Sequence, residues 1–113
     1  MKKLLVFLLL AFVYTEATSG VIYVCKEKYE ADIKVYITDN KYEADLAVFI
    51  VDEKYKAKHH DEMWYFSKQY IASESTKIYL VNYKYDADVI VYYTNYFSDA
   101  RWLKSNKWRG RFK

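Results

Sequence analysis

The sequence predicts a mainly β fold built from six short repeats of about 13 residues, each a variation on the pattern YxxD-x-x-YxAD. Two markers define the repeat. An aromatic residue recurs at Tyr23, Tyr36, Phe49, Trp64, Tyr79 and Tyr92, and an alanine recurs at Ala31, Ala44, Ala57, Ala72, Ala87 and Ala100. Both series advance by 13, 13, 15, 15 and 13 residues, so they keep one register through two insertions. Branched residues around each aromatic indicate strands.

Residues 1–17, before the repeats, are expected to be a secretory signal. Lys2 and Lys3 precede an uninterrupted apolar run of 11 residues, 4–14. A membrane span needs roughly 17 to 25 apolar residues, so this run is too short for one. We expect cleavage after Ala17, with Gly20 as the latest site, and an exported product, periplasmic or secreted. An uncleaved membrane anchor is the alternative; after removal of the signal no transmembrane segment is expected.

Residues 18–102 are predicted to form a single repeat domain in which each repeat begins with a short strand. In the clearest copy, branched and aromatic side chains fill residues 35–38, so both faces of the strand are apolar. Polar residues 39–41 then favour a turn. A tyrosine two residues before the alanine, as at Tyr42 and Ala44, predicts a second short strand.

The recurring alanine and the scarcity of glycine and proline indicate how the chain is expected to run. A recurring alanine lets another backbone approach closely, which predicts repeated crossings or stackings. The chain has no proline and no glycine between Gly20 and Gly110, whereas tight hairpins generally use glycine or asparagine. A stack of coils or an interwound arrangement is therefore favoured over a hairpin meander. Cys25 is the only cysteine and is expected to be a small buried hydrophobe; a lipidated or dimer-forming cysteine is the alternative.

The repeats KVYITDNKYEAD and KIYLVNYKYDADVIVYYTN, closed by Ala100, Arg101 and Trp102, resemble the small septoil-knot domain proteins of bacteria. The resemblance covers roughly residues 21–108. It implies that the six repeats are interwound as a deep torus knot with seven crossings. Without it, periodicity alone predicts an unknotted β-solenoid or a small β-sandwich. The resemblance implies no catalytic residue and no cofactor.

Two groups of polar residues are candidate sites in the repeat region. His59, His60, Asp61 and Glu62 are adjacent, and imidazole and carboxylate groups bind metals or transfer protons. Their spacing matches no HExxH motif, so a solvated loop is favoured. The carboxylates beside the alanines, such as Asp32, are expected to serve solubility and lysine pairing rather than to form a calcium ladder. No metal site is predicted.

Residues 103–113 are expected to form a basic, aromatic C-terminal tail. From Arg101 onward the chain has six basic residues and no acidic one, and Trp102, Trp108 and Phe112 are interleaved with them. Basic and aromatic residues together suit anionic polymers or membrane surfaces. The candidate anionic-surface residues are Lys107, Trp108, Arg109 and Arg111. The alternative is that Trp102 and Leu103 cap the last repeat and a solubilising tail follows.

The function predicted from these features is a non-enzymatic structural or binding module of the bacterial envelope or exterior. Exposed tyrosines would contact a partner such as cell-wall glycan, an anionic surface or a protein. Nucleic acid is disfavoured because the protein is expected to be exported. A monomer without a cofactor is expected. The alternative is a small metal-dependent or hydrolytic enzyme that uses His59 to Glu62.

Overall fold

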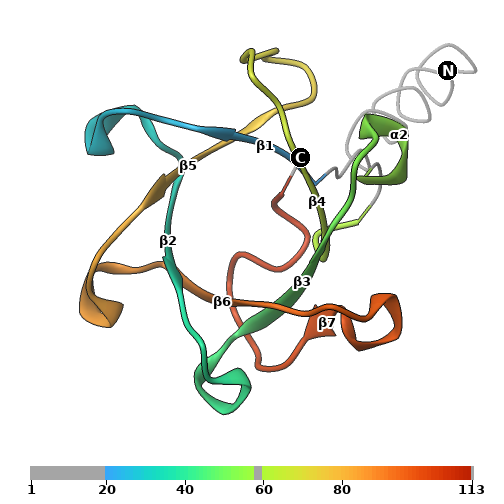
Figure 1. Cartoon of the computed structure of the whole chain (residues 1–113). Helices are drawn as coiled ribbons and strands as arrows, with labels where there is room; N and C mark the ends of the chain where they lie inside the picture. The colour runs from blue at the N-terminus through green and yellow to red at the C-terminus, as the bar shows by residue number, and fades with distance from the viewer. Residues whose placement is uncertain (1–19, 58–59, 113) are drawn as a thin grey trace, which may run out of the picture.

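A computed structural model describes residues 20–57 and 60–112. The prediction of a mainly β fold is confirmed: short strands alternate with single helical turns (Figure 1). The strands are β1 (Val21–Val24), β2 (Ile33–Ile37), β3 (Leu46–Ile50), β4 (Met63–Phe66), β5 (Thr76–Leu80), β6 (Val89–Tyr93) and β7 (Arg101–Trp102). The turns are η1 (Lys28–Glu30), η2 (Lys41–Glu43), α2 (Lys54–Ala57), η3 (Lys84–Asp86) and η4 (Phe97–Asp99).

The first six strands form a closed, barrel-like ring in the spatial order β4-β1-β5-β2-β6-β3, and β3 pairs with β4 to close it (Figure 1). All six of these pairings are parallel. Because parallel neighbours cannot be joined by a tight hairpin, each connection either passes to a strand farther along the ring or, between β3 and β4, crosses over through a longer segment that contains α2. The expectation against a hairpin meander is therefore confirmed for the ring strands.

The chain passes around the ring in two interleaved laps. Strands β1, β2 and β3 form the first lap, with gaps that β5 and β6 of the second lap fill. Pairing is staggered by half a strand: the start of β2 pairs with the end of β5, and the end of β2 pairs with the start of β6. Each strand thereby bridges two neighbours from the other lap, so neither lap completes its hydrogen bonds alone.

The ring encloses the main hydrophobic core. Strands β1, β2, β3, β5 and β6 turn branched side chains inward, and each of these residues is no more than 1% exposed: Ile22, Ile33, Val35, Leu46, Val48, Ile78, Val89 and Val91. Alternation along each strand explains why every second residue faces the interior. Burying one such side chain contributes about 1.5 to 3 kcal/mol, so the ring interior is the principal source of stability.

The fourth repeat departs from the predicted register by one residue. We call the residue before each aromatic marker the first position of its repeat and the residue after the marker the third position. In the regular pairs the first-position residue of one strand lies opposite the third-position residue of its neighbour, as Val91 lies opposite Ile37. In β4 the residue in that place is Trp64, opposite Ile50. The prediction that Trp64 occupies the same repeat position as the other aromatic markers is therefore wrong. Trp64 is fully buried because it fills the interior where the other strands have isoleucine or valine.

A second hydrophobic cluster covers the outer face of the ring along β1, β4 and β3. It contains Val21, Val51, Ala57 and Met63, with Phe49 among the residues packed against it. Helix α2 lies outside the ring at this side (Figure 1). Helix α2 has four residues and the η turns have three each, and no helix among the described residues is long and apolar enough to cross a bilayer.

Candidate binding surface

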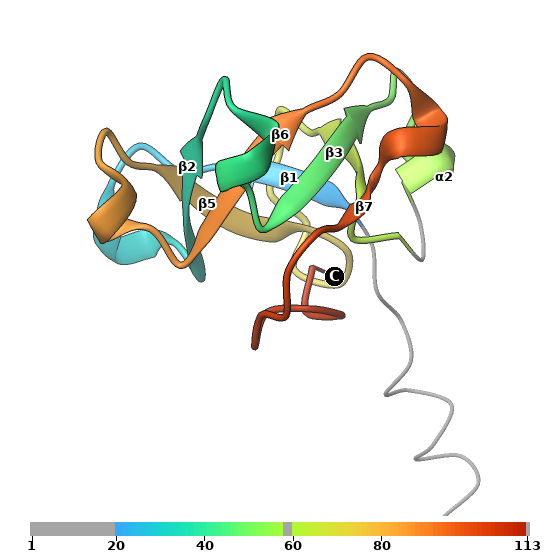
Figure 2. The same cartoon turned by 90° about the horizontal axis from the view of Figure 1, so that it is seen from below.

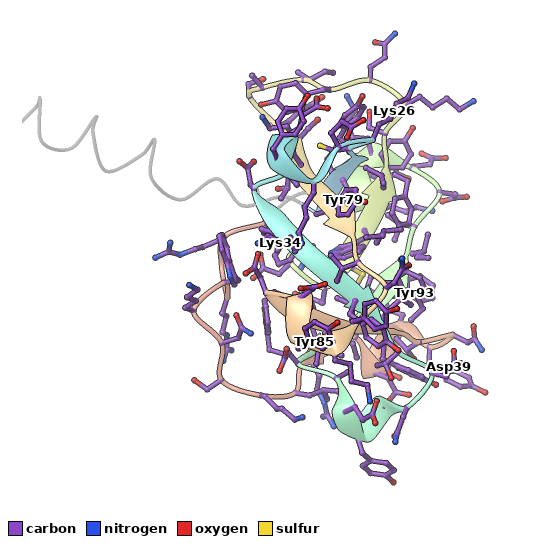
Figure 3. The ribbon with its side chains drawn as sticks, turned by 90° about the vertical axis from the view of Figure 1, so that its left-hand side faces the viewer. Lys26, Lys34, Asp39, Tyr79, Tyr85 and Tyr93 are labelled. Atoms are coloured by element: carbon purple, nitrogen blue, oxygen red, sulfur yellow. The ribbon has the colours of Figure 1, made fainter. Side chains whose placement is uncertain are left out.

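The outer face of β5, β2 and β6 lacks the apolar cover seen on the opposite side. Lys34, Tyr36 and Tyr79 are half-buried there, and Lys34 lies opposite Tyr79 in the strand register. Turn η3 packs beside β2 and adds Tyr85, which is 82% exposed. Figure 3 shows Lys34, Tyr79 and Tyr85 on this side of the molecule. We call Lys34, Tyr36, Tyr79 and Tyr85 the aromatic face.

Each helical turn projects away from the ring (Figure 1). Each turn also carries an exposed aromatic side chain. The exposed fractions are 85% for Tyr29, 90% for Tyr42, 65% for Tyr55, 82% for Tyr85 and 68% for Phe97. The prediction of a second strand at these tyrosines is wrong for η1, η2 and η3, which are 3-10 turns. Their tyrosines point to solvent because a turn of three residues has no second layer to pack against.

The alanine after each 3-10 turn returns the chain to the ring. In η1, η2, η3 and η4 its N–H donates to the carbonyl of the residue three positions earlier, as Ala44 does to Lys41 at 3.2 Å. Ala44 and Ala57 are fully buried, which fits the expected close approach, whereas Ala72 is exposed. The alanine is thus a packing residue in part of the repeats and only the end of a turn in the others.

The aspartates that follow the alanines bind backbone rather than lysine side chains at two sites. Asp45 Oδ2 accepts the N–H of Ile90 at 2.9 Å, and Asp88 Oδ2 accepts the N–H of Lys34 at 2.9 Å. Each aspartate N–H also donates to the carbonyl of that same partner residue, at 2.8 Å in both cases. These carboxylates therefore join one lap to the other, as structural residues.

Turns η2 and η3 are joined by an ion pair. Lys84 Nζ lies 2.6 Å from Glu43 Oε1, and Thr38 donates its hydroxyl to Glu43 Oε2 at 3.0 Å. The hydrogen bond from Lys84 and then that from Thr38 hold the pKa of Glu43 below its usual value. The same hydrogen bond raises the pKa of Lys84. Turns from the two laps are thereby joined at the surface next to the aromatic face.

The C-terminal segment folds back across one opening of the ring (Figure 2). Strand β7 pairs antiparallel with β3, and Phe112 is fully buried in the main core. The Phe112 ring lies 5.5 Å from that of Trp64 and 6.2 Å from that of Trp102. Asp61 Oδ2 accepts hydrogen bonds from Trp102 Nε1, at 3.0 Å, and from Gly110 N. The end of the chain is therefore part of the packed domain.

The candidate anionic-surface residues lie on this segment. Trp108 is half-buried against the core, and Lys107 Nζ and Arg111 Cζ lie 5.6 Å and 6.0 Å from its ring centroid. Trp108 and Arg111 line a cleft of about 310 Å³ with Asp32, Ile33 and Thr76. The structure thus brings Lys107, Trp108 and Arg111 together; Arg109 is exposed beside them.

The residues of the candidate metal or acid–base cluster face different surroundings. His59 lies outside the described residues. His60 is exposed, and its Nδ1 lies 3.1 Å from Glu62 Oε1. Asp61 is 7% exposed and is engaged with the C-terminal segment. Among the described residues, no group of three or more histidine, cysteine, aspartate or glutamate side chains is placed to hold a metal ion.

Cys25 is 5% exposed and unpaired, at the end of β1. Burial, with a smaller contribution from Glu30, raises the pKa of its thiol. A buried thiol with a raised pKa is a poor nucleophile, so the residue fits the predicted small buried hydrophobe.

Comparison with protein families gives one match. A family model described as the 7(1) septoil knot domain matches residues 20–103, most of the described chain. The match ends before the segment that contains Lys107, Trp108 and Phe112. No curated protein and no solved structure matches the chain.

Proposed function

The chain belongs to the septoil knot domain family, and from this premise we propose that it is a non-enzymatic exported module that binds polymer at the envelope or the cell exterior. The observation that carries the proposal is the set of exposed turn tyrosines, Tyr29, Tyr42, Tyr55 and Tyr85. Tyrosine provides a large, rigid contact surface with an apolar ring and a polar hydroxyl. These rings are not needed in the core, because inward strand residues and Phe112 fill it.

The scaffold part of the proposal is that the two laps are threaded through each other as a torus knot with seven crossings. The interleaved strand order and the family match support this path. A threaded chain unfolds only after its crossings loosen, so the expected consequence is slow unfolding without any disulfide. Unfolding in concentrated guanidinium within milliseconds would contradict the threaded scaffold.

Export rests on residues 1–17, which lie outside the described residues. Gly20 is already part of the fold: its N–H donates to Ala57 O and its carbonyl accepts from Tyr65 N, both at 2.9 Å. Cleavage after Gly20 would remove both hydrogen bonds, which supports Ala17 as the cleavage site. The mature protein would then keep Gly20 and both of its hydrogen bonds, and a monomer is the expected state of a ring whose strands are already paired.

The exposed cations Lys107, Arg109 and Arg111 beside Trp108 are a second part of the proposed surface, directed at anionic polymer. Truncation at residue 104 is a poor test of this part, because it would also remove Phe112 from the core. Charge-neutralising variants of the exposed cations leave the packed aromatic residues in place and are the better choice.

The test is co-sedimentation of the purified protein with insoluble cell-wall and polysaccharide material. Replacing Tyr29, Tyr42, Tyr55 and Tyr85 by serine should lower the bound fraction at least tenfold. Replacing the same four residues by phenylalanine keeps the rings and should retain most of the binding. Unchanged melting temperatures would show that both variants fold. Equal binding by the serine variant and the wild-type protein would contradict the proposed function.

A further inference from the structure

A cationic cleft lies between turn η2 and the end of β7, and none of its lining residues belongs to the aromatic face or is Trp108. Its volume is about 330 Å³, and it is lined by Lys41, Tyr42, Ala44, Arg101, Leu103 and Lys104. Three of these side chains are cations, and Tyr42 is 90% exposed. The volume is at the small end of the range for small-molecule sites, which suits one sugar unit rather than a large ligand.

Arg101 reverses the charge that the repeat has at this place. Ala31, Ala44 and Ala87 are each followed by an aspartate, whereas Ala100 is followed by Arg101. Backbone contacts fix its position, because Arg101 pairs with Ala47 of β3. The next residues are fixed by Asp45, whose carbonyl accepts the N–H of Leu103 at 2.7 Å and that of Lys104 at 3.2 Å. Main-chain bonds thus fix the backbone of Arg101 and Lys104 beside the cleft.

Two carboxylates of the segment that contributes Lys41, Tyr42 and Ala44 to the cleft are already engaged elsewhere. Glu43 binds Lys84 and Thr38, and Asp45 accepts the backbone N–H of Ile90. Lys104 Nζ donates to the main-chain carbonyl of Glu43 at 3.2 Å, not to its carboxylate. Among the residues that the structure describes, neither Lys41 nor Arg101 has an ion-pair partner. The cleft therefore has positive charge available for an anionic ligand.

We infer that this cleft binds a carboxylate-bearing sugar unit of an acidic polysaccharide, an inference that rests on the proposed function and names its ligand class. The planar guanidinium of Arg101 can bind a carboxylate through two parallel hydrogen bonds, and Lys41 and Lys104 add charge. The exposed ring of Tyr42 offers an apolar platform for the C–H face of the sugar. The cleft is partly open to solvent, so the rest of a polymer can lie outside it.

The experiment is a calorimetric titration of the purified protein with trigalacturonate, its methyl ester and inorganic polyphosphate. The acid should bind at least tenfold more tightly than the uncharged ester. The double variant Arg101→Gln and Lys104→Gln should weaken trigalacturonate binding at least tenfold. The matched variant Lys26→Gln and Lys68→Gln removes the same charge from exposed sites elsewhere and should change binding less than twofold. Tyr42→Ser should weaken binding about threefold, and Tyr29→Ser should not.

Three results would overturn the inference: no binding of trigalacturonate, equal binding of acid and ester, or equal losses in the two charge variants. Polyphosphate binding as tight as that of trigalacturonate and insensitive to Tyr42→Ser would also overturn it, because the site would then recognise charge alone. Co-sedimentation distinguishes a failure of this inference from a failure of the proposed function. Co-sedimentation lost in the four-tyrosine serine variant but kept in the Arg101 and Lys104 variant would leave the proposed function standing while this cleft is excluded.

Discussion

The two sides of the ring share one strand pattern, but they differ in how far their outward-facing residues are buried. On the side of β1, β3 and β4, the residue just before the inward first position is Val21, Ala47 or Met63, and each is no more than 5% exposed. On the side of β2, β5 and β6, the same position holds Lys34, Lys77 or Ile90, all half-buried. One side is therefore a second core beneath α2, and the other is an open surface that contains the aromatic face.

The difference in burial between the two sides follows the residue type at one outward position of each strand, the residue just before the first position. The inward residues are apolar on both sides, so the interior does not distinguish them. On the side of β1, β3 and β4 the outward position is apolar and is covered by α2, Val51 and Phe49, whereas Ile90 on the other side stays half-buried. A lysine there can keep its charged end in water while its stem lies along the sheet. A repeat protein can thus keep one interior while one outer face is packed and the other stays open to solvent.

The largest expected effect is on the covered side, at Gly20. A Cβ on this residue would lie 1.7 Å from the carbonyl oxygen of Met63, so Gly20→Ala must separate the two segments. We expect a loss of about 4 kcal/mol or more in the free energy of unfolding. Gly110→Ala is the control: its Cβ would meet no atom within 4 Å, and its φ of 79° costs about 1 kcal/mol. Denaturant titration measures both, and equal losses would contradict the close crossing at Gly20.

A lysine exchanged between the two sides tests the comparison directly. Met63→Lys places a charge in the outer cluster and should lower the free energy of unfolding by about 3 kcal/mol. Lys34→Met, on the open side, should change it by less than about 0.5 kcal/mol. Urea denaturation followed by far-ultraviolet circular dichroism gives both values. Similar values for the two variants would mean that the two outer faces do not differ as described.

Asp61 tests how the covered side holds the C-terminal segment. Asp61→Leu leaves the N–H groups of Trp102 and Gly110 without their acceptor, and the expected loss is about 2 to 3 kcal/mol. Asp61→Asn retains an acceptor oxygen and should lose less. Tryptophan fluorescence reports the release of Trp102. A leucine variant as stable as the wild-type protein, with unchanged fluorescence, would show that this carboxylate does not hold the segment.

Much of this architecture follows from the sequence because the repeat is regular. The repeat predicts strands around its aromatic markers, and the first-position residues Ile22, Val35, Val48, Ile78 and Val91 all lie in strands and in the core. The family and the mainly β class were predicted as well. The turn tyrosines were expected to lie on strands, because a short 3-10 turn has no periodicity of its own to detect.

The fourth repeat could not be aligned from its aromatic marker. Trp64 resembles the outward tyrosines as a residue type, yet strand pairing places it inward. The better signal was Asp61, which precedes Trp64 by three residues as Asp45 precedes Val48. The docking of Phe112 was also missed, since an aromatic residue among basic ones has the same sequence pattern whether it is buried or exposed. The cleft at Arg101 depends on β7 lying beside η2, a contact between distant segments.

The smallest expected effect is a difference in the pH dependence of stability between two tyrosines on β6, the inward Tyr93 and its outward neighbour Tyr92. The ring of Tyr93 packs 6.3 Å from that of Trp64, and burial raises its pKa to about 12. In the unfolded chain a tyrosine ionises near pH 10, so the stability that Tyr93 provides is complete below about pH 10 and is lost as the pH rises toward 12. Tyr93→Phe should therefore flatten the decline of unfolding free energy over this range.

Tyr92→Phe, at the adjacent outward position, should leave the slope closer to that of the wild-type protein. Denaturant titrations between pH 9 and 12 decide the matter, and an equal flattening by both variants would mean that the direction of the side chain does not determine the effect.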